Sequence, residues 1–174
     1  MNAARKPCRT SGLPERGGHL CDSGRTPMRV AVGVDHAGYV LKAEVLAEAR
    51  DLGYGTLDLG THDEGAVDYP DYAEAVARAV AGGQADLGIL ICGTGIGMSI
   101  AANKVDGAYA AHASDCFSAR MARLHNAANI LAIGGRVLGP GLAREVVRAF
   151  LMTEPTDGER HERRRGKVRK LEGC

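Results

Sequence analysis

The sequence predicts an α/β fold: a three-layer, doubly wound arrangement of a five-stranded parallel sheet with helices on both faces and a further helix at the C-terminus. Two observations predict it. Short runs rich in Val, Ile and Leu recur along the chain, and segments with helical spacing of apolar residues separate them. Strands buried on both faces are apolar throughout, and parallel neighbours need a crossover connection, which is usually a helix.

Five apolar runs are interpreted as the strands, and they are 28–34, 54–59, 87–91, 107–113 and 129–134. In an open parallel sheet the ligand site lies outside the carboxyl ends of the strands. The residues that follow these runs are therefore candidates for function, although the fold itself selects no reaction.

Helices are expected between and after the strands. Their expected positions are 38–52, a segment from Pro70, a segment after the glycine-rich turn at 92–97, 115–124 with Ser114 as N-cap, a segment from Pro140-Gly141 through Phe150, and 159–171. In the first two, one face gathers the apolar residues Leu41, Val45, Ala49 and Leu52, and Ala73, Val76, Ala77 and Val80, respectively.

Residues 1–27 differ in composition from the rest of the chain. They are rich in Gly, Pro, Arg and Ser without sustained periodicity, so we interpret them as a disordered extension or an artefact of start-site choice, with a true start at Met28. Residues 28–174 are long enough to form one domain with a substantial core. N-terminal mass analysis of native protein tests this division, since a native chain carrying residues 1–27 excludes a start at Met28.

Composition argues against several classes of protein. The 22 Lys and Arg residues nearly balance the 21 Asp and Glu residues, which gives no global attraction to nucleic acid or to a membrane surface. No apolar run approaches the roughly 18 residues of a membrane span, and residues 1–27 lack the apolar segment of a signal peptide. The five cysteines are odd in number and irregularly spaced, which favours a reducing cytoplasm over a disulfide-bonded fold.

The segment Cys92-Gly93-Thr94-Gly95-Ile96-Gly97-Met98-Ser99 is the most informative in the chain. It joins a strand to a helix, and such a turn aims backbone N–H groups at one point, where a phosphate, an oxyanion or a Cys92 thiolate would be stabilised. The turn is neither Gly-x-Gly-x-x-Gly nor a P-loop, so NAD and ATP are not favoured. The simpler interpretation is an inert buried Cys92, with Thr94 and Ser99 only capping the helix.

Other polar residues follow strands or end helices. Asp35-His36 follows the first strand, Arg136 follows the fifth, and His125-Asn126 ends the helix before it. Arg160 and Arg164 share a helix face and could grip a phosphate together. Most have a structural alternative. Asp35 could cap a helix with His36 on the surface, His125-Asn126 could form a helix C-cap, and the arginines of the last helix could form a solvated basic surface. The His, Cys and acidic residues lack metal-ligand spacing, so no metal and no other cofactor is expected.

Several motifs occur together and in order, namely Val34-Asp35-His36-Ala37-Gly38, Asp68-Tyr69-Pro70, the turn at 92–99, His125-Asn126, Gly134-Gly135-Arg136 and Arg160-His161. These motifs make the sequence closely resemble the type B ribose-5-phosphate isomerases over about residues 28–171. The same family also includes the lactose-pathway galactose-6-phosphate isomerases. The resemblance implies a Rossmann-like five-stranded fold and a homodimer or dimer of dimers with a shared active site. It also implies metal-free interconversion of ribose 5-phosphate and ribulose 5-phosphate in the pentose phosphate pathway.

The resemblance further implies a role for each matching residue. Cys92 would be the general base that moves a proton between C1 and C2 through a cis-enediolate, and Met98 stands where another branch of the family has a glutamate. His125 would open the furanose ring. The turn residues implied to stabilise the enediolate oxygens are Gly93, Thr94, Gly95, Ile96 and Gly97. The residues implied to bind the sugar and its phosphate are Asp35, His36, Tyr69, Ser99, Asn126, Arg136, Arg160 and Arg164, with Arg163 and Arg165 as alternatives to Arg164.

Three alternatives stay open from the sequence. The same chemistry could act on a six-carbon sugar phosphate, such as galactose or allose 6-phosphate. The chain could bind phosphosugars without turnover, although the presence of both Cys92 and His125 counts against that. The basic residues at 163–170 could bind RNA through their charge.

Overall fold

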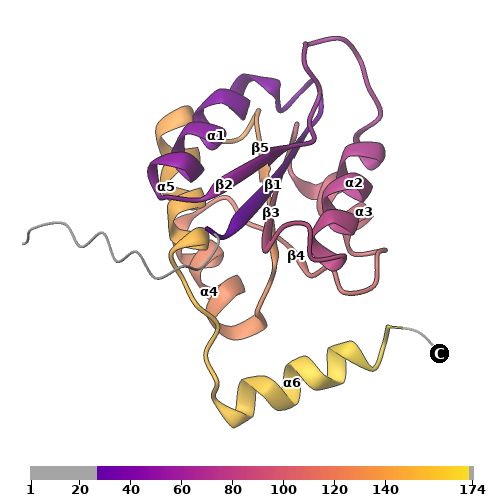
Figure 1. Ribbon diagram of the computed structural model, residues 1–174, viewed down its shortest axis with the longest axis vertical. Helices are drawn as coiled ribbons and strands as arrows, with labels where there is room; N and C mark the ends of the chain where they lie inside the picture. The colour runs from indigo at the N-terminus through magenta and orange to yellow at the C-terminus, as the bar shows by residue number, and fades with distance from the viewer. Residues whose placement is uncertain (1–26, 173–174) are drawn as a thin grey trace, which may run out of the picture.

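The computed structural model describes residues 27–172, which form three layers around one parallel sheet (Figure 1). The sheet has five strands in the order β2-β1-β3-β5-β4. Their bounds are β1 (Arg29–Val34), β2 (Gly55–Asp58), β3 (Leu87–Cys92), β4 (Ala110–His112) and β5 (Ile130–Gly134). The predicted fold class is confirmed, although β4 is shorter than the run at 107–113. The extension predicted at 1–27 lies, except for residue 27, outside the described residues.

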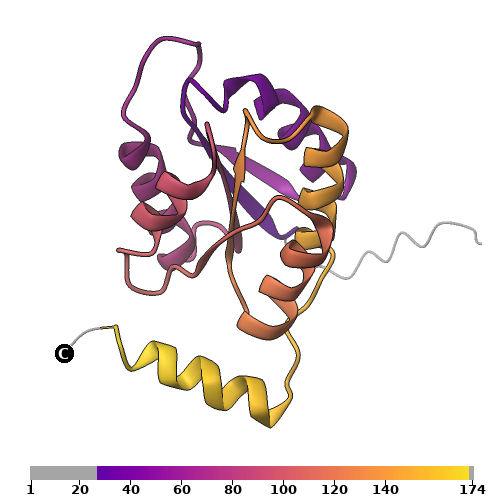
Figure 2. The same ribbon diagram turned by 180° about the vertical axis from the view of Figure 1, so that it is seen from behind.

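Helices cover both faces of the sheet (Figures 1 and 2). A short 3-10 helix, η1 (Tyr39–Leu41), leads into α1 (Lys42–Asp51), which packs on one face with α4 (Cys116–Asn126) and α5 (Pro140–Leu151). The other face carries α2 (Tyr69–Ala81) and α3 (Ile96–Ala102). The last helix, α6 (Glu159–Arg169), buries none of its residues.

Alternate strand residues supply the two cores, which explains why the strands are apolar throughout. In β1, Val30 and Val32 pack towards α1 and α5, whereas Ala31 packs towards α2. In β3, Ile91 belongs to the first core and Cys92 to the second. The last residue of β3 therefore points to the side of the sheet that α2 and α3 cover.

The ends of α4 differ from the prediction. Asp115, not Ser114, is the N-cap: its backbone is extended and its carboxylate accepts from the Ser118 N–H at 2.8 Å. The hydrogen bonds from Ser118 hold the pKa of Asp115 below its usual value. At the other end, Ala127 has the left-handed conformation (φ 52°), so Asn126 is a helical residue and not the left-handed C-cap. Within 27–172, no helix is long and apolar enough to cross a membrane.

Candidate active site

The glycine-rich turn places the Cys92 thiol at the carboxyl end of the sheet. Cys92 is 5% exposed, and the Gly95 N–H donates to its Sγ over 3.1 Å. Gly95 has a φ of 82°, and a Cβ there would lie 2.9 Å from the Ile133 carbonyl carbon. Gly134 is equally restricted, because its Cβ would lie 2.9 Å from Thr94 Cα. The turn after β3 therefore lies directly against the end of β5.

Three more predicted residues lie at the same carboxyl edge. Asp35 is 5% exposed and accepts from the Gly38 N–H at 2.9 Å within the turn before η1, whose N-cap is Gly38 and not Asp35. The Arg136 N–H donates to the Gly93 carbonyl at 3.0 Å, which holds Arg136 beside the turn. The Tyr69 ring lies over Gly97, where a Cβ would be 2.9 Å from its Cε2.

His36, Thr94 and Ser99 also make local contacts at this edge. His36 Nδ1 accepts from the Val67 N–H at 3.3 Å, which leaves its Nε2 as the donor. Thr94 Oγ1 accepts from the Ile96 N–H at 3.4 Å, and Ser99 Oγ donates to the Ile96 carbonyl at 3.1 Å. Both contacts are local, but neither hydroxyl caps α3: its N-cap is Gly95, which receives no side-chain cap hydrogen bond, and Ser99 lies within the helix.

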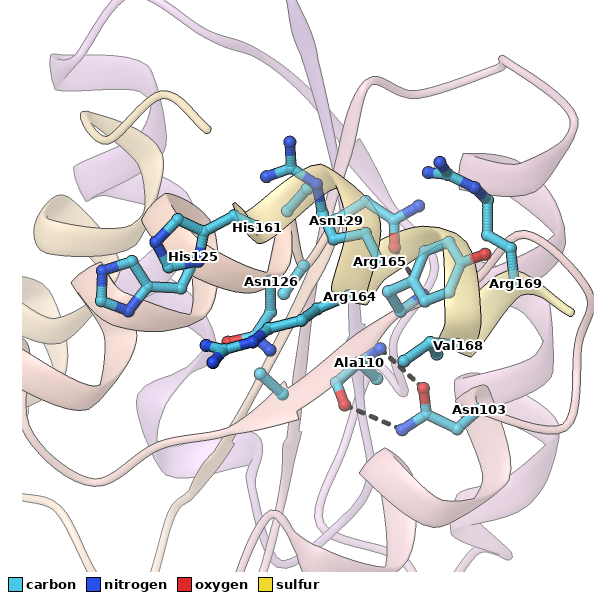
Figure 3. Close-up of a pocket in the computed structure, with 14 residues that line it drawn as sticks. Asn103, Ala110, His125, Asn126, Asn129, His161, Arg164, Arg165, Val168 and Arg169 are labelled. Atoms are coloured by element: carbon cyan, nitrogen blue, oxygen red, sulfur yellow. Dashed lines mark hydrogen bonds between the residues drawn. The ribbon is translucent and has the colours of Figure 1, made fainter. Parts of the chain in front are cut away.

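A second group of predicted residues lies around a cavity of about 680 Å³ beside α6 (Figure 3). His125, Asn126 and Arg164 line it together with His161. The rings of His125 and His161 stack with their centroids 4.4 Å apart and their planes 8° apart. Partial desolvation of His161, reinforced by His125 and the neighbouring arginines, lowers its pKa from 6.5. The cavity is therefore strongly basic around a pair of imidazoles.

The arginines of α6 have different environments. Arg165 is half-buried as a residue, with its side chain 10% exposed, and it donates to the Glu162 carboxylate and the Thr156 carbonyl. Its Nη1 atom is buried and has no hydrogen-bond partner among residues 27–172. Arg164 is exposed and lines the cavity. Arg160 does not line it, and its Nη2 lies 3.4 Å from His161 Nε2. Of the three arginines at 163–165, Arg164 and Arg165 face the cavity.

The cavity lies at the amino edge of the sheet, where the strands begin. Cys92 lies at the opposite, carboxyl edge, where the strands end. It is lined by the residues that begin β4 and precede β5, including Ala110 and Asn129. In the pairing of β3 with β5, Gly88 is level with Ile130, and Cys92 is level with Gly134. Four residues of strand separate the two edges by roughly 13 Å. Within one chain, the predicted site residues therefore form two groups, one around Cys92 at the carboxyl edge and one around His125 at the cavity.

The family comparison follows the same part of the chain. The family described as Ribose/Galactose Isomerase matches residues 30–168, which include both groups of site residues. The chain belongs to this family. Its members are sugar phosphate isomerases, so the predicted family and the predicted aldose–ketose isomerase are confirmed.

Two curated relatives and one solved structure of this family show the extent of the similarity. The chain is 52% identical over 142 residues to a putative sugar phosphate isomerase of Bacillus subtilis, covering 81% of this chain and 95% of the relative. It is 48% identical to ribose-5-phosphate isomerase B of Escherichia coli, covering 78% and 91% of the two chains. The structure of Trypanosoma brucei type B ribose 5-phosphate isomerase matches with a TM-score of 0.82 and 45% identity, covering 84% of this isomerase and 100% of that chain.

The sequence did not single out one residue of this isomerase that touches the turn. His112, at the end of β4, has its Nε2 2.9 Å from the Thr94 carbonyl oxygen. No local motif marks it, because the contact depends on the turn after β3 leaning across the end of β5. Within 27–172, no three His, Cys, Asp or Glu side chains form a group that could hold a metal ion.

Proposed function

We propose that the chain interconverts ribose 5-phosphate and ribulose 5-phosphate in the cytoplasm, as a step of the pentose phosphate pathway. The observation that carries the proposal is the Gly95 N–H donating to Cys92 Sγ at 3.1 Å. A backbone N–H held against the sulfur stabilises negative charge there, as a general base acting through its thiolate requires. Within residues 27–172, Cys92 and Cys116 form no disulfide with each other, which agrees with a reducing compartment.

In the proposed reaction, the Cys92 thiolate removes the proton from C2 of the open-chain aldose. The electron pair moves towards C1, and the resulting cis-enediolate oxygens accept hydrogen bonds from N–H groups of the turn at 93–97. The proton of the C2 hydroxyl moves to the C1 oxygen, and return of the abstracted proton from the Cys92 thiol to C1 then gives the ketose and regenerates the thiolate. Asp35 and Asn126 bind sugar hydroxyls, and the other substrate contacts come from His36, Tyr69, Ser99 and Arg136.

The phosphate and the ring oxygen are assigned to the basic cavity. His125 opens the furanose by moving a proton between the C1 hydroxyl and the ring oxygen. Arg164 and Arg160 bind the phosphate, and the buried, unpartnered Nη1 of Arg165 supports an anion at this place. When the phosphate is held, C1 and C2 of the sugar are kept in a fixed position relative to the catalytic groups. The binding energy of the phosphate is thus used to orient the reacting atoms.

The two groups can act on one sugar only if a second copy of the chain supplies one of them. His125 and Cys92 act on C1 and its neighbouring atoms, yet one chain separates their edges by roughly 13 Å. A symmetric dimer brings the amino edge of one protomer to the carboxyl edge of its partner, twice. The apolar side chains Tyr69, Ile96 and Val137 are 41%, 52% and 55% exposed at the carboxyl edge, as expected of a surface that a second copy covers.

Conversion of ribose 5-phosphate by reduced, purified protein in the presence of EDTA tests the proposal. The expected result is turnover that chelation leaves unchanged and that exceeds turnover of galactose or allose 6-phosphate. Preference for either six-carbon substrate would replace the proposed substrate. Binding of ribose 5-phosphate without any isomerisation would instead favour a phosphosugar-binding protein.

A further inference from the structure

We infer that His112 is a positioning residue, which holds and polarises the peptide between Thr94 and Gly95 so that its N–H stabilises the Cys92 thiolate. This inference rests on the proposed role of Cys92 as general base. It adds a residue that reaches the site from β4, two strands away from β3 in the sheet.

The two hydrogen bonds belong to one peptide group. His112 Nε2 lies 2.9 Å from the Thr94 carbonyl oxygen, and the Gly95 N–H donates to Cys92 Sγ at 3.1 Å. The Thr94 carbonyl and the Gly95 N–H are the two ends of a single planar peptide unit. An imidazole that fixes one end therefore fixes the direction of the other.

The direction of the first hydrogen bond follows from its acceptor. A carbonyl oxygen only accepts, so Nε2 of His112 carries the proton. Donation to a carbonyl draws electron density from the amide nitrogen and strengthens donation by its N–H, an effect of roughly 10–30% per bond in a hydrogen-bonded chain. The chain from His112 through the peptide to sulfur thus favours negative charge on Cys92.

The surroundings hold the imidazole against the turn. The ring contacts Gly95, where a Cβ would lie 2.7 Å from His112 Cδ2, so only glycine leaves room for it. Asn103, which follows α3, brackets the backbone of Ala110 by donating to its carbonyl at 2.8 Å and accepting from its N–H at 2.9 Å (Figure 3). Residues 110 and 112 share one face of β4, so this clamp sets the position of His112.

The test compares His112→Leu, which keeps bulk but removes the donor, with His112→Gln, which restores a side-chain N–H. The readout is the rate at which iodoacetamide alkylates Cys92 near neutral pH, measured by mass spectrometry on the tryptic segment 79–104, in which Cys92 is the sole cysteine. The loss of one hydrogen bond predicts about threefold to tenfold slower alkylation in His112→Leu. His112→Gln should recover most of the wild-type rate.

Steady-state kinetics supply the second readout. His112→Leu is expected to lower kcat by a factor similar to its alkylation defect, with KM for ribose 5-phosphate nearly unchanged, because the residue acts on the thiolate and not on the phosphate. Equal alkylation rates in all three proteins, or an equal loss in the Leu and Gln variants, would overturn the inference. If wild type turns over no sugar phosphate, the proposed function fails, yet the alkylation comparison still decides whether His112 positions the turn.

Discussion

The two edges of the sheet hold their functional residues by different means. At the carboxyl edge, Cys92 ends a strand whose residues are all buried, and backbone hydrogen bonds fix the turn that follows. At the amino edge, α6 buries no residue, and polar contacts tie it to the fold. Just beyond the end of α6, the Tyr109 hydroxyl donates to Glu172 at 2.8 Å, and desolvation together with this carboxylate raises the pKa of Tyr109 to about 12.

This difference suits two separate tasks, proton abstraction at the carboxyl edge and phosphate binding at the amino edge. A base and an oxyanion site need fixed geometry, which a buried strand end supplies through the fold itself. The proposed phosphate contacts, Arg160 and Arg164, lie on α6, which buries no residue within one chain. Conservative changes of the Cys92 side chain should therefore change catalysis with little effect on folding, whereas changes at the amino edge should affect binding and the attachment of α6.

The largest effect is expected from Cys92→Ser. A serine hydroxyl is too weakly acidic to replace a thiolate, so kcat should fall by about a hundredfold to ten-thousandfold, the usual contribution of a general base. The affinity for ribose 5-phosphate and the melting temperature should stay close to wild type. Stopped assays of ketose formation measure the change, and turnover near wild type would remove Cys92 from the mechanism.

His125→Asn separates ring opening from proton transfer. Turnover of the cyclic sugar phosphate should fall by about a hundredfold. An open-chain substrate, which needs no ring opening, should lose much less. Equal losses on cyclic and open-chain substrates would argue against this role for His125.

Arg164→Ala tests the phosphate contact, with Arg163→Ala as a matched control on the same helix. Arg164 lines the cavity and Arg163 does not. Loss of one charge-assisted hydrogen bond should raise KM by about tenfold in Arg164→Ala. The control should stay within about twofold of wild type. A larger KM effect from Arg163→Ala would exchange their assignments.

The smallest expected effect concerns pH and α6. The pKa of His161 lies below 6.5 in the folded protein, so the unfolded chain binds more protons between that lowered pKa and 6.5. Stability then rises with pH through this window and falls as pH drops below 6.5. His161→Phe keeps a ring for stacking but cannot titrate, so its melting temperature should change less between about pH 5.5 and pH 7.5 than that of wild type. If calorimetry shows the same dependence of melting temperature on pH in His161→Phe and wild type, His161 does not cause the pH dependence of stability.

The carboxyl edge could be predicted from the sequence because its residues follow apolar strands directly. Cys92, Asp35 and Arg136 needed only strand positions and the rule for parallel sheets. His112 escaped notice because its contact with Thr94 depends on the order of the strands. The cap of α4 was misassigned by one residue, since Ser114 and Asp115 are both good caps and only backbone geometry chooses between them.

The amino edge shows where sequence reasoning alone stops. Strand ends do not indicate where His125 lies, because it comes at the end of a helix that runs back to the other edge. Its pairing with Cys92 was implied by family resemblance, and the structure gives a physical reason why one chain cannot bring the two together. The shared site is thus the central claim.

Subunit complementation tests that claim most directly. Purified Cys92→Ser and His125→Asn proteins, each nearly inactive, are mixed under conditions that allow protomers to exchange. If each site takes Cys92 from one protomer and His125 from its partner, mixed dimers contain one intact site, and activity should approach about a quarter of wild type. Exchange verified by mass spectrometry with no recovery of activity would contradict a site shared between two copies.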